Sequence, residues 1–307
     1  MNNRKNLAMV AACYAIWGIL PLYWHQLSGI SPLTILACRF VMSAVFTVGL
    51  LAATKRLPEL AAVLKNWKLM KYLIPASLCI TVNWGVYIWA VGIGKVTDAS
   101  LGYYLNPLVV FLLGVFVFKE RCGRTELFAL LLAAAGVALA TLQLGAFPVT
   151  AVTLAVSFAL YGMFKKFAHV DGVVSIAAET LLLTPAALLF LIFSPQSQAA
   201  FASASPLEWV LLAFAGVVTA VPLILYSHGV NGLPFITMGF LQYICPTLML
   251  LLAVAMGEPF TAAQGVSFAL IWAGLILFSV GSVRRERAKR LEAAAETPAP
   301  AAAAESE

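Results

Sequence analysis

The sequence predicts an all-α polytopic membrane protein with ten transmembrane helices, built as two sets of five with opposite orientation. Composition is the first reason: 62% of the 307 residues are hydrophobic and only 10% are charged, whereas a soluble domain has about 25% charged residues. The second reason is that apolar runs of membrane-spanning length recur along most of the chain. The third is that the two halves share landmark residues at nearly constant spacing.

Each apolar run is expected to form a helix, because backbone groups in lipid must be hydrogen-bonded within the segment. Strands that cross a membrane would be about ten residues long and would alternate in hydropathy, and these runs do neither. The ten predicted spans are residues 7–26, 31–53, 72–92, 98–118, 124–143, 148–165, 173–193, 208–228, 233–256 and 262–282.

Basic residues indicate how the spans are oriented. Of the 19 Lys and Arg residues, Arg39 lies within a span and Lys95 follows the third span, while the other seventeen fall at the termini and at alternate connections. Lys165 and Lys166 are among the seventeen, in the connection after the sixth span. The positive-inside rule therefore predicts that both termini are cytoplasmic. A net charge of +6 distributed in this way reflects membrane topology, so a lipid bilayer is the expected partner and nucleic acid is not.

The second half of the chain repeats landmarks of the first. Each half contains five spans, and an odd number per half places the second half upside down relative to the first, as in inverted-repeat transporters. The matching residues are Ala15–Gly18 with Ala159–Gly162, Glu120 with Glu258, Gly136 with Gly274, Gly92 with Gly229, Gly102 with Gly239 and Pro107 with Pro246. The predicted division is a cytoplasmic N-terminus (1–6), a first repeat (7–143), a second repeat (148–282) and a basic, then disordered, cytoplasmic tail (283–307).

Arg39 is the only charged residue of its apolar run, "PLTILACRFVMSAVFTVGLLA". Its counterpart in the repeat is Glu179, 140 residues later in "SIAAETLLLTP". An Arg or Asp at mid-span costs about 2.5–3.5 kcal/mol on insertion scales, and such residues usually face the protein interior, pair, or line a wet path. Three interpretations stay open: a structural ion pair or anchor, a role in substrate or proton coupling, and snorkelling to an interface.

Amide and aromatic residues collect in the third, fourth and ninth spans. An amide at hydrocarbon depth needs a hydrogen-bonding partner, which a neighbouring helix or a bound solute could supply. These side chains are therefore candidates for helix packing and for a substrate cavity alike. They are Asn83, Trp84 and Tyr87, then Tyr103 and Asn106, then Gln242 and Tyr243. Trp24, near the end of the first span, is interpreted instead as part of an interfacial aromatic belt.

Three of the prolines within predicted spans are hinge candidates: Pro107 in the fourth, Pro222 in the eighth and Pro246 in the ninth. Each removes a backbone hydrogen bond and can kink its helix. Because Pro107 and Pro246 occupy matching positions in the two halves, the sequence predicts that they act as paired hinges, with Pro222 as a third candidate.

Four stretches carry a resemblance to a known family: "ITVNWGVYIWAVG", "ASLGYYLNPLVVFLLGVFVFKER", "ETLLLTP" and "GFLQYICPTLMLLLAVAMGEPF". Over nearly all of residues 7–282 the chain resembles the RarD-type branch of the EamA drug/metabolite transporter superfamily. The resemblance implies a five-plus-five inverted repeat, cytoplasmic termini and a location in the bacterial inner membrane. It also implies a central cavity lined mainly by the third, fourth, eighth and ninth spans.

The expected function is secondary active transport of small metabolites, either amino-acid-like or amphipathic and drug-like, by alternating access between the repeats. Proton coupling through Glu179 is an open option. The alternatives are a non-transporting membrane sensor or structural protein and an intramembrane enzyme, which would need paired acids or a Ser–His arrangement at depth. The sequence has no phosphate-cradling loop and no Cys/His cluster, so neither a nucleotide nor a metal or other cofactor is expected. Substrate, direction and oligomeric state stay open.

Overall fold

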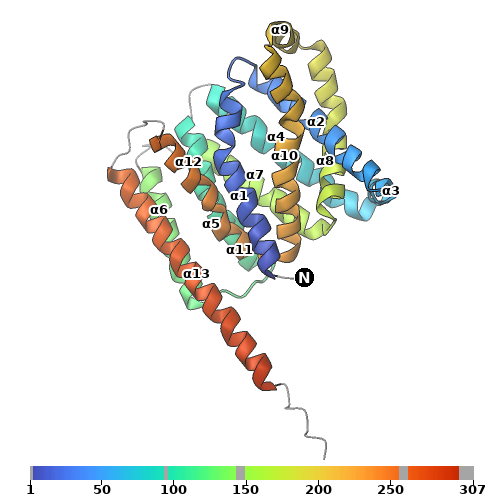
Figure 1. Ribbon diagram of the computed structural model, residues 1–307. Coiled ribbons are helices and arrows are strands. Elements are labelled where there is room, and N and C mark those ends of the chain that lie inside the picture. The colour runs from blue at the N-terminus through green and yellow to red at the C-terminus, as the bar shows by residue number, and fades with distance from the viewer. Residues whose placement is uncertain (1–2, 93–95, 143–148, 256–261, 297–307) are drawn as a thin grey trace, which may run out of the picture.

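The computed structural model describes residues 3–92, 96–142, 149–255 and 262–296, and these residues contain thirteen helices and no strand (Figure 1). In chain order they are α1 (Asn3–His25), α2 (Pro32–Ala53), α3 (Leu57–Lys65), α4 (Trp67–Gly92), α5 (Val96–Phe116), α6 (Arg124–Leu142), α7 (Val149–Ala168), α8 (Gly172–Phe193), α9 (Pro195–Ser203), α10 (Pro206–Gly232), α11 (Phe235–Gln242), α12 (Ile244–Ala255) and α13 (Ala262–Glu296).

The predicted all-helical membrane fold is confirmed at the level of its elements. Within the described residues, eight helical segments are long and apolar enough to cross a membrane, and two shorter apolar helices, Leu101–Phe116 and Gly265–Gly281, accompany them. The count of ten spans, their inverted arrangement and the side on which the termini lie stay predictions. Lys95, Glu258 and residues 297–307 lie outside the described side chains, so the expectations that rest on them also stay predictions.

Two short helices, α3 and α9, occupy connections between predicted spans. Both have proline in the first turn, where its missing N–H costs nothing and its fixed φ suits a helix. Helix α13 also differs from expectation, because it continues to Glu296 and does not end near residue 282. The stretch "RRERAKRLEAAAE" is polar but rich in strong helix formers, so the helix continues beyond the end of the apolar run.

The three candidate hinge prolines differ in whether their helices are interrupted. Helices α5 and α10 continue through Pro107 and Pro222 without a break. The predicted ninth span, in contrast, divides at Tyr243 into α11 and α12. Pro246 has no N–H to donate to the carbonyl of Gln242, so the break falls where proline removes a helical hydrogen bond. The matched pair therefore behaves differently, and whether any of the three prolines is a hinge stays a prediction.

Helices α1 and α7 each pack against members of the other half of the chain. Helix α1 contacts α10, α11 and α12, whereas α7 contacts α4 and α5; α2 packs against α8 and α10 (Figure 1). Helices α6 and α13 form a closely packed pair at the edge of the bundle. The central core between α1, α7, α10 and α11 is aromatic, with Tyr14, Tyr161, Tyr226 and Phe235 all fully buried.

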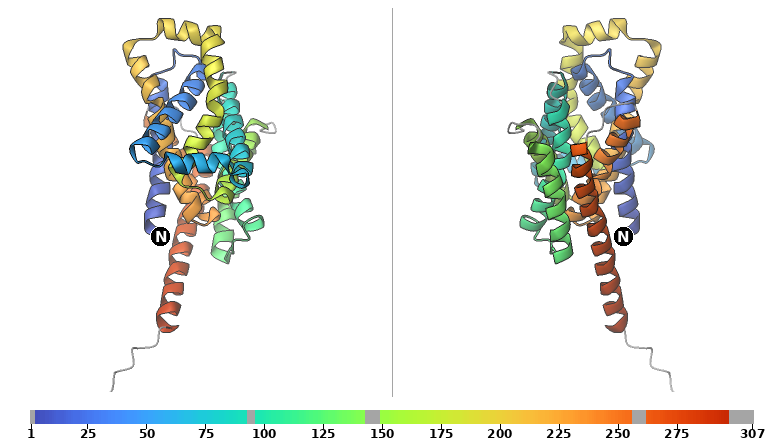
Figure 2. Two further views of the ribbon diagram at one scale, coloured as in Figure 1. Left: turned by 90° about the vertical axis from the view of Figure 1, so that its right-hand side faces the viewer. Right: turned by 90° about the vertical axis from the view of Figure 1, so that its left-hand side faces the viewer.

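The two ends of the bundle are distinguished by contacts between connections. At the first, called here the N-terminal end, the Asn6 amide donates to the Gly232 carbonyl at 3.5 Å and Arg56 lies 3.2 Å from Asp171. At the second, the α9 end, the Thr34 hydroxyl on α2 lies 3.1 Å from a hydroxyl on α9. Figure 2 shows α9 at one end of the molecule and the N-terminus toward the other, where α13 extends beyond the remaining helices. The connections at the N-terminal end carry most of the basic residues.

Glycines allow α6 and α13 to approach at backbone distance. A Cβ on Gly136 would lie 2.6 Å from the Ser267 carbonyl oxygen, and a Cβ on Gly274 would lie 2.6 Å from the Ala129 carbonyl oxygen. Gly136 and Gly274 are 138 residues apart, and so are Ala129 and Ser267. The two helices therefore present corresponding faces to each other, as an internal twofold relation would require.

This contact generates a stability prediction. Gly136→Ala and Gly274→Ala should each destabilise the protein by about 1–3 kcal/mol, because the added methyl meets backbone atoms that cannot move without separating the helices. Gly49 in α2 is exposed, and a Cβ added there would have no atom within 4 Å. Gly49→Ala is therefore the matched control and should stabilise the protein by up to about 1 kcal/mol, because alanine is the better helix former. Thermal unfolding in detergent measures all three. Equal midpoints for the three variants would contradict the close packing.

Candidate functional site

A cavity of about 560 Å³ lies inside the bundle, surrounded by α1, α2, α4, α5, α7 and α12. Its lining includes His25, Ser28 and Pro32, which lie at the α1–α2 connection. The cavity therefore reaches the molecular surface at the α9 end. Its opposite limit is set by Phe158 of α7 and Trp17 of α1, which also belong to the aromatic core. This volume falls within the range of small-molecule sites in proteins, about 300–1,000 Å³.

Arg39 projects from α2 into this cavity and is held by aromatic faces. Its guanidinium carbon lies 4.7 Å from the ring centroid of Trp24 and 4.0 Å from that of Trp84. Its Nε donates a hydrogen bond of 3.0 Å to the Thr219 hydroxyl on α10. Phe40 stacks on Trp84 at 5.5 Å and so fixes that ring. Within the described part of the chain, no carboxylate forms an ion pair with Arg39.

Two asparagines attach the neighbouring helices to α7. The Asn83 amide on α4 donates to the Leu154 carbonyl at 2.8 Å and to the Ser157 hydroxyl at 3.0 Å. The Asn106 amide on α5 donates to the Ala155 carbonyl at 2.5 Å. Asn106 is only 2% exposed, yet its Oδ1 has no hydrogen-bond partner among the described residues. A residue of the cavity lining therefore has a buried acceptor without a partner among the described residues.

The structure brings six of the nine predicted site residues to this cavity: Arg39, Asn83, Trp84, Tyr87, Tyr103 and Asn106. Trp24 lines it as well, so the interpretation of Trp24 as an interfacial belt residue is wrong. Hydropathy places a tryptophan near a span end but does not show which way the ring turns. The implied contribution of the eighth span is also wrong for this cavity, because none of its lining residues comes from α10.

Gln242 and Tyr243 do not line the cavity. Tyr243 packs with Leu101, Ala133 and Ile271 in a separate cluster toward α6 and α13. Gln242 is buried, and its Oε1 has no partner among the described residues. Both residues lie where α11 ends. Their predicted role in substrate binding therefore has no support in the geometry.

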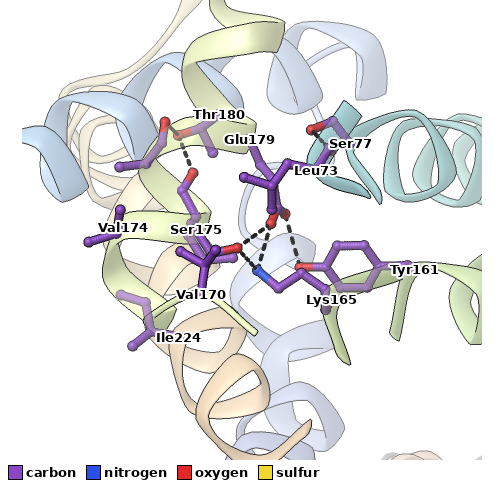
Figure 3. Close-up of polar contacts among 12 residues, drawn as sticks. Leu73, Ser77, Tyr161, Lys165, Val170, Val174, Ser175, Glu179, Thr180 and Ile224 are labelled. Atoms are coloured by element: carbon purple, nitrogen blue, oxygen red, sulfur yellow. Dashed lines mark hydrogen bonds and ion pairs between the residues drawn. The ribbon is translucent and has the colours of Figure 1, made fainter. Parts of the chain in front are cut away.

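Glu179 does not contact Arg39; it pairs with Lys165. The Lys165 ammonium lies 2.6 Å from Glu179 Oε1, which also accepts a 2.8 Å hydrogen bond from the Ser175 hydroxyl. The Tyr161 hydroxyl donates to Oε2 at 3.2 Å. Figure 3 shows the side chains of α7 and α8 converging on the carboxylate. Their arrangement meets the requirement that a charge in a dry interior be paired and hydrogen-bonded.

Lys165 is the residue that sequence reasoning missed. The apolar run stops there, which places Lys165 in the connection after the sixth span, but α7 continues to Ala168 and Lys165 is only 2% exposed. One signal was available: Tyr161 and Lys165 are four residues apart and so share a helix face. A lysine on the same face as buried apolar residues indicates an internal partner.

Along α7 the features follow one another in a fixed order from the cavity toward the N-terminal end. Leu154 and Phe158 line the cavity, Tyr161 stacks on Tyr226 at 5.8 Å, and Lys165 holds the ion pair. Leu154 and Lys165 are separated by about 16 Å along the helix, at a rise of 1.5 Å per residue. The ion pair therefore lies beyond the closed end of the cavity, not within it.

The N-terminal end of this path is fastened by Glu120, in the connection after α5. Its carboxylate accepts hydrogen bonds from the backbone N–H groups of Phe235 at 2.6 Å and Ile236 at 2.9 Å, so it caps the first turn of α11. It also lies 3.0 Å from the Lys166 ammonium of α7. This latch, defined by Glu120, Lys166 and the start of α11, joins segments from both halves.

Comparison with known proteins gives consistent results over almost the whole chain. The sequence model of the EamA-like transporter family matches twice, at residues 5–142 and 148–280. The chain is 40% identical to "Uncharacterized transporter YojE" of Bacillus subtilis, covering 94% of this chain and 97% of that protein. It is 35% identical to "Protein RarD" of Escherichia coli K12, covering 92% and 97%. It is 31% identical to "Chloramphenicol-sensitive protein RarD" of Pseudomonas aeruginosa, covering 93% and 98%.

Among solved structures, one described as "Crystal structure of protein" superimposes with a TM-score of 0.68 at 21% identity, covering 90% of this chain and 97% of the other. That likeness concerns the fold alone. The family matches, the RarD relatives and the apolar helices agree with one another. The chain belongs to the EamA-like transporter family, as a RarD-type member of the drug/metabolite transporter superfamily and a multi-pass protein of the bacterial inner membrane.

Proposed function

We propose that this membrane transporter is a secondary carrier of small metabolites or amphipathic, drug-like solutes, and that it works by alternating access between two inverted repeats. The observation that carries the proposal is the cavity. It is enclosed by helices from both halves of the chain, it is polar at a few points and apolar elsewhere, and it reaches the surface at the α1–α2 connection. A substrate site between repeats is the arrangement that alternating access needs.

Three observations support the inverted repeat. The family model matches the two halves separately. The glycine contacts between α6 and α13 are reciprocal at a constant spacing of 138 residues. Helix pairings between the halves also correspond, since α1 packs on α10 and α12 much as α7 packs on α4 and α5. Basic connections gathered at the N-terminal end favour a cytoplasmic position for that end.

In this arrangement the conformation is outward-facing. The cavity meets the surface at the α9 end, whereas the path toward the N-terminal end is blocked in turn by Tyr161 and Tyr226, by the Lys165–Glu179 pair and by the Glu120 latch. Opening the N-terminal end would require α7 to move relative to α10 and α11. The latch contacts are exposed enough to be exchanged for water, because Lys166 and Glu120 retain 20% and 16% side-chain exposure.

The cavity assignment is tested by comparing two buried amides that differ in location. Asn106 lines the cavity and Gln242 does not, although both have a buried carbonyl oxygen without a partner among the described residues. A solute that stabilises the wild type in a thermal-shift screen of amino acids, nucleosides, peptides, organic acids and amphenicols should bind about tenfold more weakly to Asn106→Leu, which loses a hydrogen-bonding group. Gln242→Leu should keep the wild-type affinity. Equal losses in both variants would contradict the assignment.

The ion pair generates a prediction about stability and coupling. Lys165→Met leaves a buried carboxylate without its cation and should lower the free energy of unfolding by about 3–5 kcal/mol, whereas Lys165→Met combined with Glu179→Gln should recover much of that loss.

Glu179 is also the proton-binding group that a proton-coupled mechanism would use. Glu179→Gln should therefore abolish flux driven by a pH gradient in proteoliposomes while leaving solute binding intact. Unchanged pH-driven flux in Glu179→Gln would leave the pair with a structural role only.

A further inference from the structure

Two cations of the described helical core differ in how their charge is compensated. Lys165 lies 2.6 Å from the Glu179 carboxylate. Arg39 has two tryptophan faces and one hydroxyl, and no carboxylate among the described residues lies within ion-pair distance. An unpaired charge at membrane depth is costly, and such charges normally pair or line a functional path. This uncompensated charge on a cavity wall is the first observation that points to a ligand.

The guanidinium is available for an anion because most of its donors are unused. Arginine has five N–H donors, and the hydrogen bond that the structure records is Nε to Thr219. The aromatic contacts hold the guanidinium without consuming those donors. Trp84 is fixed by Phe40, and Trp24 packs edge-on against Tyr23 with centroids 4.9 Å apart. A planar fork held in one position on a cavity wall is the geometry that binds a carboxylate through two parallel hydrogen bonds.

The second observation is a buried acceptor, without a partner among the described residues, on a side chain that lines the same cavity. Asn106 uses its amide N–H on the Ala155 carbonyl, so its side chain is oriented, and its Oδ1 has no donor among the described residues although Asn106 is only 2% exposed. Leaving a buried carbonyl oxygen unsatisfied costs roughly 1–3 kcal/mol. A ligand N–H or O–H would remove that cost.

The other lining residues indicate which shape and polarity the uncharged part of the ligand should have. Six aromatic residues line the cavity together with Arg39 and Asn106: Trp17, Trp24, Trp84, Tyr87, Tyr103 and Phe158. Aromatic walls favour flat apolar groups, which stack on them or meet them edge to face. No Asp or Glu is among the lining residues that the structure describes, so a cationic ligand would meet Arg39 without a counter-charge. A neutral ligand would leave the guanidinium uncompensated.

We propose that the cavity binds an organic anion with a flat apolar body: its carboxylate pairs with Arg39, its body lies between the rings, and a hydrogen-bond donor on it meets Asn106 Oδ1. The inference rests on the proposed transport function and gives that function a substrate class. It assigns Arg39 to the recognition of substrate charge. The same cation would be a purely structural anchor if the cavity selected neutral solutes.

The test uses pairs of compounds that differ only in the charged group. N-acetyl-L-tryptophan and N-acetyl-L-tryptophanamide share a flat ring and an amide donor, and only the first has a carboxylate; indole-3-acetate and indole-3-acetamide, and benzoate and benzamide, extend the comparison. Dissociation constants for the purified full-length protein are measured by microscale thermophoresis. We expect at least one carboxylate to bind the wild type ten times or more tightly than its amide.

Two variants then show which residue causes the preference for the carboxylate over the amide. Arg39→Gln should reduce the carboxylate-to-amide ratio to within about twofold while the amide binds as before, which also shows that the variant is folded. Lys71→Gln is the matched control, because Lys71 is an exposed cation outside the cavity that also lies 4.8 Å from an aromatic ring, that of Tyr72. It should keep the wild-type ratio.

Several outcomes would overturn the inference. Carboxylate and amide could bind the wild type equally, or the preference could persist in Arg39→Gln, or no carboxylate could bind at all. The carboxylate-to-amide ratio is measured first on the wild-type protein, so the inference can be rejected even if Arg39→Gln does not fold. The transport proposal fails separately, if proteoliposomes containing the protein move neither the anions nor any neutral solute that stabilises it. Flux of a neutral solute without anion preference would reject the inference and keep the transporter.

Discussion

Charge placed in hydrocarbon must be compensated inside the protein, and this constraint organises the structure around α7. Lys165 carries an ion pair to Glu179 that Ser175 and Tyr161 complete with hydrogen bonds. These contacts join α7 to α8, while two asparagines join α4 and α5 to the preceding turns of α7. Since lipid offers the backbone and side chains no hydrogen bonds at this depth, each polar contact fixes one relative position of two helices. The cavity keeps its shape because its walls are attached to α7 in this way.

The order of features along α7 gives the molecule its asymmetry. One end of the path is open to the surface through the α1–α2 connection, and the other is filled by aromatic rings, the ion pair and the Glu120 latch. Helix α7 carries part of the cavity wall, the residues that close the cavity and one side of the latch. It therefore couples the three mechanically, because none of them can move far without the others. Alternating access would use this coupling to open one end only as the other closes.

Much of this could be predicted from the sequence, for reasons that particular residues make clear. Arg39, Asn83 and Asn106 stand out because polar groups at hydrocarbon depth are conspicuous in apolar runs. Lys165 escapes notice because a helix can continue past the point where its hydropathy falls. Trp24 was assigned to the wrong environment, and Gln242 could be assigned neither to helix packing nor to the cavity, because a helix that is apolar all round has no moment to show which way a side chain faces. Packing decides that direction, and a single sequence does not contain it in readable form.

The central claim is that the cavity lined by Tyr87, Arg39 and Asn106 is exposed to each side of the membrane in turn. The most direct measurement is the reaction of a single cysteine, Tyr87→Cys, with a membrane-impermeant thiol reagent added to either side of oriented proteoliposomes. In the variant used for labelling, the five natural cysteines are replaced by alanine; they are Cys13, Cys38, Cys79, Cys122 and Cys245. The account predicts labelling from both sides, with a transported solute changing the ratio of the two rates. Labelling from one side alone, whatever solute is present, would contradict it.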